Sequence, residues 1–221
     1  AVADPAVPAG GAEIPWQIKI FNKSLKKKLK WNILERILPA GLPPAARCLD
    51  LGCAKGTFSW LLRTRGGGWV SADLDAANLR ATRDLVGPGV VRVDYRQLPF
   101  ADGAFDLVVH SDTLEHVPDP VRGLAECRRV LRDGGACVFT VPMVVGRLTR
   151  SRAGLPASYH GTPADGDGYL VHTEFGADAW RWPLSAGFTE CRVVAIEPAG
   201  EEDVYDLTVP GPSCWLADGI V

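Results

Sequence analysis

A short apolar run, residues 47–51, ends in a loop of small residues that also contains a carboxylate. Asp50, Gly52, Ala54 and Gly56 follow one another at alternate positions. Small residues at the end of a strand let a ligand contact the backbone directly. A pyrophosphate would favour bare N–H groups at a helix N-terminus, whereas Asp50 places a negative charge beside the loop. The loop therefore suits a cationic or neutral ligand.

The segment after this loop has the pattern of a helix followed by a strand that ends in an acid. Residues 57–62 have the periodicity of an amphipathic helix, and residues 69–73 are predicted to form a strand ending at Asp73. Neighbouring parallel strands open on one crevice at their carboxyl ends, so Asp73 is expected where a ribose can donate both hydroxyl protons to it. Asp75 lies beyond the strand and is expected to cap the helix that begins near Ala76.

Residues 49–56 resemble the first motif of the class I S-adenosylmethionine (SAM) methyltransferases, with an alanine at the usual position of the second glycine. A third predicted strand, 90–95, is followed by Leu-Pro-Phe at 98–100 and Phe-Asp-Leu-Val-Val at 105–109, the pattern of small-molecule methyltransferases in this family. The resemblance covers residues 19–194. It implies an α/β fold: a Rossmann-like seven-strand-type methyltransferase sheet, mostly parallel, with a C-terminal antiparallel hairpin and helices on both faces.

The resemblance implies that SAM is the cofactor. In this family the acid at the end of the third strand and its neighbour flank the adenine, which assigns that role to Asp94 and Tyr95. The expected cofactor-binding residues are Asp50, Gly52, Cys53, Ala54, Gly56, Asp73, Leu74, Asp94, Tyr95 and His110.

Titratable side chains follow the predicted fourth strand. Residues 114–120, Leu-Glu-His-Val-Pro-Asp-Pro, resemble the same segment of quinone-pathway O-methyltransferases and their relatives. Methyl transfer from a sulfonium is an in-line displacement, so the protein mainly aligns the acceptor and removes a proton when the acceptor is a hydroxyl. The candidate catalytic residues are His116, His110 and Asp112. His116 either accepts the proton or only holds the loop.

A long segment rich in glycine, proline and polar residues, 142–172, follows the predicted fifth strand at 136–141. It is expected to lie over the crevice, where this superfamily builds its acceptor site. Part of it is similar to methyltransferases encoded with glycan assembly enzymes. Its arginines either bind a phosphate on the acceptor or form a solvated basic loop. The expected substrate-binding residues are Arg147, Tyr159, His160 and His172.

The predicted function is transfer of a methyl group from SAM to a small-molecule acceptor, with a hydroxyl oxygen of a glycan- or quinone-related compound as the expected target. The alternative is a non-catalytic SAM-binding or partner-binding module. The Asn/Asp-Pro-Pro-aromatic signature of enzymes that methylate base nitrogens is missing after the fourth strand, so no nucleic-acid partner is expected. No metal site is expected either, because these residues lack the tight spacing of metal ligands: Glu115, His116, His160 and His172.

The two ends of the chain differ from the region between them. Residues 1–15 are predicted to be disordered, and residues 16–196 to form the methyltransferase domain. Residues 16–38 are predicted to form one basic helix, either a lid over the cofactor or a contact with an anionic membrane or nucleic acid. Residues 197–221 resemble the C-terminal block of inteins but lack its terminal His-Asn pair, which excludes splicing. They form either such a remnant or a hairpin with strands at 205–209 and 214–217.

The whole-chain composition suits one α/β domain: 221 residues, 47% of them hydrophobic and 23% charged, with a net charge of −2. No segment is long and apolar enough to span a bilayer, and no secretory signal is visible. Six cysteines occur without a Cys-x-x-Cys pair, which favours buried thiols in a reducing cytoplasm. The oligomeric state stays open.

Overall fold

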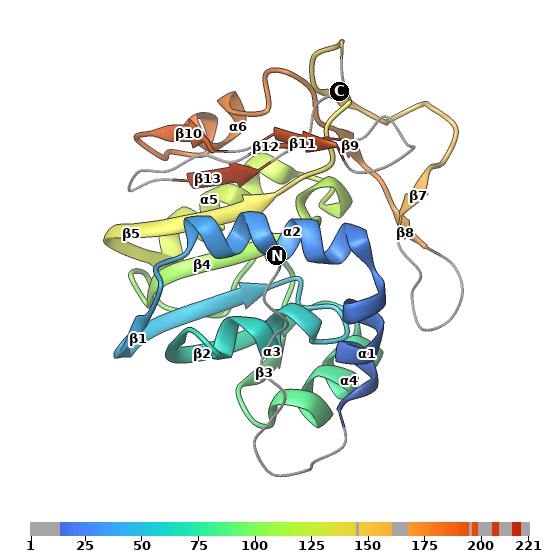
Figure 1. Ribbon diagram of the computed structural model, residues 1–221. Coiled ribbons are helices and arrows are strands. Elements are labelled where there is room, and N and C mark those ends of the chain that lie inside the picture. The colour runs from blue at the N-terminus through green and yellow to red at the C-terminus, as the bar shows by residue number, and fades with distance from the viewer. Residues whose placement is uncertain are drawn as a thin grey trace.

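A single parallel sheet forms the centre of the molecule (Figure 1). The computed structural model describes residues 14–144, 146–160, 168–194, 196–198, 205–207 and 214–217. Within these residues the sheet has seven strands in the order β10-β13-β5-β4-β1-β2-β3, and each neighbouring pair is parallel. The strands are β1 Leu42–Leu51, β2 Gly66–Asp73, β3 Val90–Arg92, β4 Phe105–Ser111, β5 Leu131–Thr140, β10 Cys191–Val193 and β13 Cys214–Ala217.

Helices cover both faces of this sheet, as the resemblance implied (Figure 1). They are α1 Trp16–Lys23, α2 Leu25–Ile37, α3 Thr57–Arg63, α4 Ala76–Val86, α5 Pro120–Val130 and α6 Arg181–Ser185, with a short 3₁₀ turn, η1 Leu114–His116. In the described part of the chain, three two-stranded antiparallel ribbons lie outside the sheet. They pair β6 Arg150–Ser151 with β9 Thr173–Glu174, β7 Tyr159–His160 with β8 Tyr169–Leu170, and β11 Ile196–Pro198 with β12 Tyr205–Leu207.

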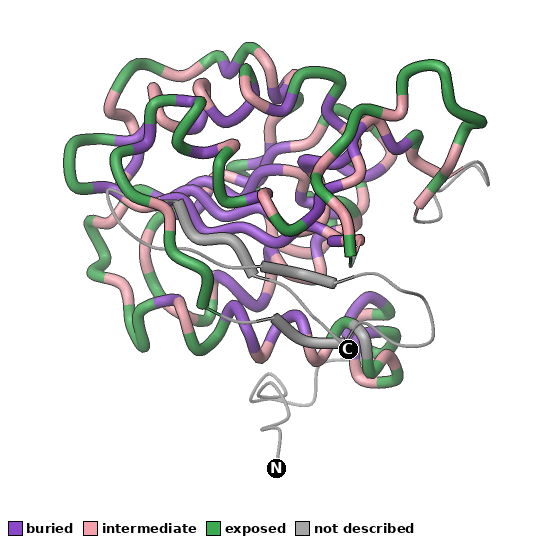
Figure 2. The backbone as a smooth tube through the Cα atoms, turned by 90° about the horizontal axis from the view of Figure 1, so that it is seen from above, coloured by how far each residue is buried: buried purple, intermediate pink, exposed green. Residues whose placement is uncertain are grey.

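Alternation along the strands sends side chains into two hydrophobic clusters. Leu107 and Val109 of β4 pack with α1, α2 and α3, whereas Val108 packs with α5 on the opposite face. Figure 2 shows these buried residues concentrated along the central strands. The consecutive buried apolar residues of β1 (Cys48 and Leu49) and β4 (Leu107, Val108 and Val109) therefore reflect burial on both faces of a parallel sheet.

The predicted basic helix 16–38 is two helices. Ser24 has an extended backbone, with φ −98° and ψ 107°, and its hydroxyl accepts the N–H of Lys27 at 3.3 Å. A serine side chain that caps a new helix competes with continuation of the old one, which explains the break. Leu25, directly after the break, is exposed.

The C-terminal region contains an antiparallel hairpin, but with a different pairing from the one predicted. Residues 205–207 pair with 196–198, while 214–217 insert between β5 and β10 in the parallel direction. Insertion lets one strand satisfy backbone groups on two neighbours instead of one. The predicted disordered segment, 1–15, lies almost wholly outside the described residues, as does much of the intein-like tail.

Gly176, which precedes α6, packs against the backbone of residues 147–149. Among the described helices, none has the length and apolar character needed to cross a bilayer.

Candidate active site

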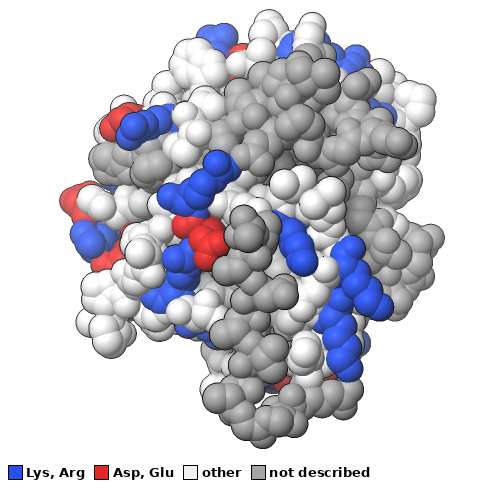
Figure 3. All heavy atoms as spheres, in the orientation of Figure 1, with Lys and Arg blue, Asp and Glu red and all other residues white. Residues whose placement is uncertain are grey.

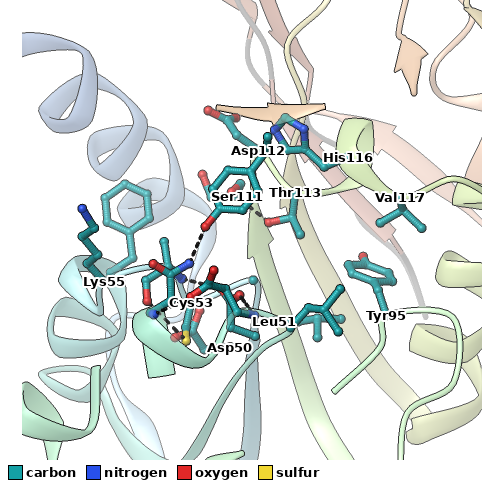
Figure 4. A pocket seen from close by; sticks show the side chains of 18 of the residues that line it. Asp50, Leu51, Cys53, Lys55, Tyr95, Ser111, Asp112, Thr113, His116 and Val117 are labelled. Carbon is teal, nitrogen blue, oxygen red and sulfur yellow. Dashed lines mark hydrogen bonds between the residues drawn. The ribbon is translucent and has the colours of Figure 1, made fainter. Parts of the chain in front are cut away.

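A cavity of about 1150 Å³ opens at the carboxyl ends of β1, β2 and β4. Its walls come from the loops after these strands, from α1 and α2, and from residues 142–172. Figure 4 shows the labelled side chains of β1, of the loop after β4 and of η1 arranged around this space. The sequence-predicted crevice is therefore present, at the edge of the sheet where it was expected.

The loop after β1 is held in a sharp turn. Gly52 has φ +77°, and the N–H groups of Gly52 and Cys53 donate to Ala72 O at 2.7 and 3.0 Å. A Cβ at Gly52 would overlap the Thr113 hydroxyl and lie 2.9 Å from Thr113 Cβ. Glycine is therefore required here by backbone conformation and by close packing against the loop after β4.

Ala54 adopts a left-handed backbone with φ +47°, a conformation that costs a residue with a Cβ about 1–2 kcal/mol. Two polar contacts hold it there. Its N–H donates to Asp73 Oδ2 at 2.8 Å, and the Thr82 hydroxyl donates to its carbonyl at 2.8 Å. Gly56, with φ +84°, then starts α3. Ala54 therefore adopts the left-handed backbone that a glycine would adopt at this position of the motif.

Asp73 lies at the end of β2 and lines the cavity. Its Oδ2 accepts the N–H of Ala54, and its Oδ1 accepts the N–H of Asp75 at 2.9 Å. Burial raises the pKa of this carboxyl, and the two backbone donors oppose the rise. Each oxygen keeps a further lone pair, so the carboxylate is oriented and can still accept two hydroxyl protons. Asp75 caps α4 through the N–H groups of Ala77 and Asn78, which confirms its predicted structural role.

Asp50 is 4% exposed, lines the cavity and accepts a hydrogen bond from the Ser59 hydroxyl. Burial raises the pKa of this carboxyl to about 6, against the opposing effects of Ser59, Ser71 and Arg63. A cationic group in the cavity would favour the ionised form.

Lys27 and Lys55 line the same cavity. Burial lowers the pKa of Lys27, and the positive charge of Lys55 lowers it further. Two ammonium groups that repel each other in one cavity form a region suited to an anion such as a carboxylate. Neither lysine is among the cofactor-binding residues predicted from the sequence.

The predicted adenine-binding residues occupy different environments. Asp94 lines the cavity and is held by Arg96, whose Nη2 donates at 2.8 Å and lowers the pKa of the carboxyl. Tyr95 is 7% exposed, and its ring meets His110 edge-on at 5.3 Å. Tyr95 also lines the cavity, so its ring forms a buried wall rather than a surface aromatic. Leu74 lines the cavity too and is 59% exposed.

His110 was predicted to bind cofactor and to act in catalysis, and its position contradicts both roles. It is 1% exposed, stacks on Phe139 at 4.6 Å and is not among the cavity-lining residues. Burial lowers its pKa to about 3. Successive residues of a strand face opposite sides of the sheet, so Ser111 reaches the cavity while His110 points into the core.

His116 lines the cavity at η1. Its Nδ1 lies 3.0 Å from Leu170 O, and because a carbonyl only accepts, Nδ1 carries the proton. Burial lowers the pKa of His116 to about 4. The imidazole is therefore neutral near pH 7, and Nε2 is its proton acceptor.

Segments far apart in sequence meet at this histidine. The His160 and Tyr169 rings lie 5.9 and 5.7 Å from the His116 ring, and His172 lines the cavity as well. One donor atom each from Glu115, His116 and His160 fall within 4.8 Å of one another, so these are residues that can hold a metal ion, although sequence spacing predicted none. A second such group, His110, Cys127 and Cys137, is fully buried in the core.

Asp112 lines the cavity and connects two elements. Its carboxylate pairs with Lys30 of α2 and accepts the Thr140 hydroxyl at 2.8 Å. This ion pair fastens α2 across the cavity, in agreement with the predicted lid.

Two predicted substrate-binding residues are not among the cavity-lining residues. Arg147 pairs with Glu174 at 2.9 Å, and Arg150 and Arg152 pair with the same carboxylate. Tyr159 is 58% exposed and outside the lining. The antiparallel pairing of β6 with β9 draws the arginines onto Glu174, away from the cavity wall. His160 and His172 do line the cavity, as predicted.

Comparison with known proteins supports this geometry. A family model described as a methyltransferase domain matches residues 49–139. The chain is 32% identical over 195 residues to malonyl-[acyl-carrier protein] O-methyltransferase of Geobacter sulfurreducens, a match that covers 85% of the chain and 70% of that protein. It is 36% identical over 103 residues to ubiquinone biosynthesis O-methyltransferase of Hahella chejuensis, covering 44% of the chain and 43% of that relative.

Among solved structures, an S-adenosylmethionine dependent methyltransferase from Mesorhizobium loti matches with a TM-score of 0.56 at 22% identity. The match covers 75% of this chain and 83% of that one. This likeness shows the same fold.

Proposed function

Since the chain belongs to the class I SAM-dependent methyltransferases, we propose that it transfers the methyl group to a hydroxyl oxygen of a small-molecule acceptor. The observation that carries the SAM part of the proposal is the Asp73 carboxylate, which the Ala54 and Asp75 N–H groups orient at the end of β2. A carboxylate held in this way can accept the two hydroxyl protons of a ribose.

The residues present fit SAM. Asp73 would hold the ribose, Asp94 and Tyr95 would flank the adenine, and the loop from Gly52 to Gly56 would lie against the remainder. The ammonium groups of Lys27 and Lys55 suit the carboxylate of the methionine part, and Asp50 places negative charge near its cationic groups. When bound, SAM supplies an electrophilic methyl group on a sulfonium.

We assign proton removal to His116. Its protonated Nδ1 is fixed on Leu170 O, which leaves Nε2 as the acceptor for a hydroxyl proton. Nearby, His160, Tyr169 and His172 supply polar and aromatic contacts that orient the acceptor. Alignment of acceptor and methyl carbon is the main task of the protein in such a displacement.

The relatives' names and the cavity support the acceptor class that we propose. One relative methylates a malonyl-[acyl-carrier protein], and another acts in ubiquinone biosynthesis; both transfer to oxygen. The cavity exceeds the usual volume of a single small-molecule pocket, so it has room for a cofactor and an acceptor together. These relatives support an oxygen acceptor. The ubiquinone biosynthesis relative favours a quinone-related one, and the glycan-related alternative rests on the sequence resemblance alone.

The test is calorimetric titration of SAM and, separately, of NAD into the protein and its Asp73→Ala variant. We expect SAM binding, no NAD binding, and a loss of about 1.5–3 kcal/mol in SAM affinity for the variant. Asp119→Ala is the matched control, because Asp119 caps α5 and lies outside the cavity lining. Equal SAM affinity of the Asp73→Ala variant and the wild type would contradict the ribose assignment.

A further inference from the structure

One face of α1 combines exposed apolar and basic side chains. Trp16, Lys19, Ile20 and Lys23 recur at helical spacing and are all exposed, Trp16 by 49% and Ile20 by 47%. The opposite side of the helix carries buried residues that fix its orientation: Gln17, Ile18 and Phe21. Leu25, the first residue of α2, follows Lys23 by two positions and is 72% exposed.

The charge of this region is of a single sign, in contrast to the chain's net charge of −2. The sequence from 14 to 34 contains no Asp or Glu. Figure 3 shows blue side chains along the right-hand edge, where α1 and the start of α2 lie in Figure 1. The lysines of the stretch are Lys19, Lys23, Lys26, Lys27, Lys28 and Lys30.

This surface is continuous with the cavity. Trp16 and Ile20 are exposed and also line the cavity, together with Lys27 of α2. A partner that contacts the exposed face of α1 therefore also meets the rim of the cavity.

We propose that the α1–α2 face, defined as Trp16, Lys19, Ile20, Lys23 and Leu25, docks on an anionic lipid bilayer with the cavity rim toward the lipid. Interfacial helices use this chemistry: tryptophan and aliphatic side chains enter the boundary between headgroups and acyl chains, and lysines contact anionic headgroups. Nucleic acid would satisfy the lysines but would leave Ile20 and Leu25 exposed to water. The combination therefore favours a bilayer.

The proposal goes beyond the transferase activity and does not depend on the acceptor. Docking of the α1–α2 face would bring the cavity rim to the bilayer, so an amphiphilic acceptor could pass from the lipid into the cavity. Only this consequence rests on the proposed function.

The experiment measures cosedimentation of the full chain with phosphatidylcholine vesicles, with and without phosphatidylglycerol. We expect binding that requires phosphatidylglycerol and weakens with added salt. The informative variant is Lys23→Gln with Leu25→Ser, because neither residue lines the cavity. Loss of the lysine alone should weaken partitioning about fivefold, and loss of both should weaken it further.

Matched controls replace exposed residues elsewhere, Leu184→Ser on α6 and Arg192→Gln on β10, and should bind vesicles as the wild type does. Titration of SAM into every variant reports separately on the cavity, so failure of docking and failure of the proposed function are distinguishable. The proposal would be overturned if the wild type bound no vesicles, or if it bound both vesicle types equally. It would also be overturned if the double variant bound vesicles as well as the wild type does, or if the protein bound nucleic acid more tightly than vesicles.

Discussion

At the scale of single residues, Gly52 shows how tightly the loop after β1 meets the loop after β4. Its φ is +77°, and a Cβ there would overlap the Thr113 side chain. The Gly52→Ala variant should lose about 1–2 kcal/mol through the backbone and about 1–3 kcal/mol more through overpacking. Urea unfolding measures the loss, and SAM affinity should fall with it because the loop lines the cavity.

Gly146 provides the control for this substitution. It has the same φ of +77°, but a Cβ there would meet nothing within 4 Å. Gly146→Ala should therefore show the backbone cost alone. Equal destabilisation by both variants would show that contact with Thr113 is unimportant.

His116 is the residue on which proton removal depends in the proposed mechanism. His116→Gln should lower kcat about 10²–10⁴-fold with little change in SAM affinity. Because burial lowers the pKa of His116 to about 4, the neutral base predominates at pH 6–8. The wild-type rate should lack a histidine inflection there and fall only as the pH approaches about 4. An unchanged kcat in the variant would leave His116 with only its structural contact to Leu170.

At the scale of elements, one ion pair fastens α2 over the cavity. Lys30 and Asp112 have side chains 10% and 28% exposed, so their pairing is only partly screened by solvent. Lys30→Met should cost about 1–2 kcal/mol in unfolding free energy and should speed amide exchange in α2. Lys28→Met, on the same helix and outside the cavity lining, is the control.

A double-mutant cycle with Asp112→Asn separates the ion pair from other contacts of Lys30. We expect a coupling energy of about 1 kcal/mol between the two sites. Additive effects would mean that α2 is held by its apolar face alone, through Trp31, Leu34 and Ile37.

At the scale of the whole molecule, buried titratable groups make stability depend on pH, and His110, His116 and Asp50 have large shifts in pKa. Burial lowers the pKa of His110 to about 3 and that of His116 to about 4, both below the ordinary value of 6.5. Below pH 6.5 the unfolded chain takes up protons that the folded chain does not, so stability falls. Asp50 acts oppositely: its pKa is raised to about 6, so the folded chain takes up that proton first.

From these three groups we predict that the free energy of unfolding falls by about 3 kcal/mol between pH 7.5 and pH 5. Each imidazole contributes a loss of about 2 kcal/mol, and Asp50 offsets about 1 kcal/mol. In the His110→Phe variant, the free energy of unfolding should fall by about 2 kcal/mol less over the same pH range. Urea unfolding at the two pH values measures this difference. His172→Gln serves as the control. If wild type and His110→Phe lose equal stability, His110 does not stay neutral in the folded core.

The sequence alone determined the part of the site that contiguous residues encode. Strand, glycine-containing loop and terminal acid follow one another within short segments, so periodicity and turn chemistry identified β1, β2 and β4 and the loop at Gly52. The same information placed Asp73 at the end of its strand and made Asp75 a helix cap. These features depend on local backbone geometry, which a short stretch of sequence largely specifies.

Only the tertiary structure decided which side chains share a cavity. His110 and Ser111 are neighbours in sequence, yet they face opposite sides of β4. Helix packing buries His110 in the core, whereas Ser111 lines the cavity. His116 meets Leu170 O across 54 residues, and Lys30 of α2 reaches Asp112 after β4. Such contacts depend on how elements pack on both faces of the sheet, and local sequence carries little record of that packing.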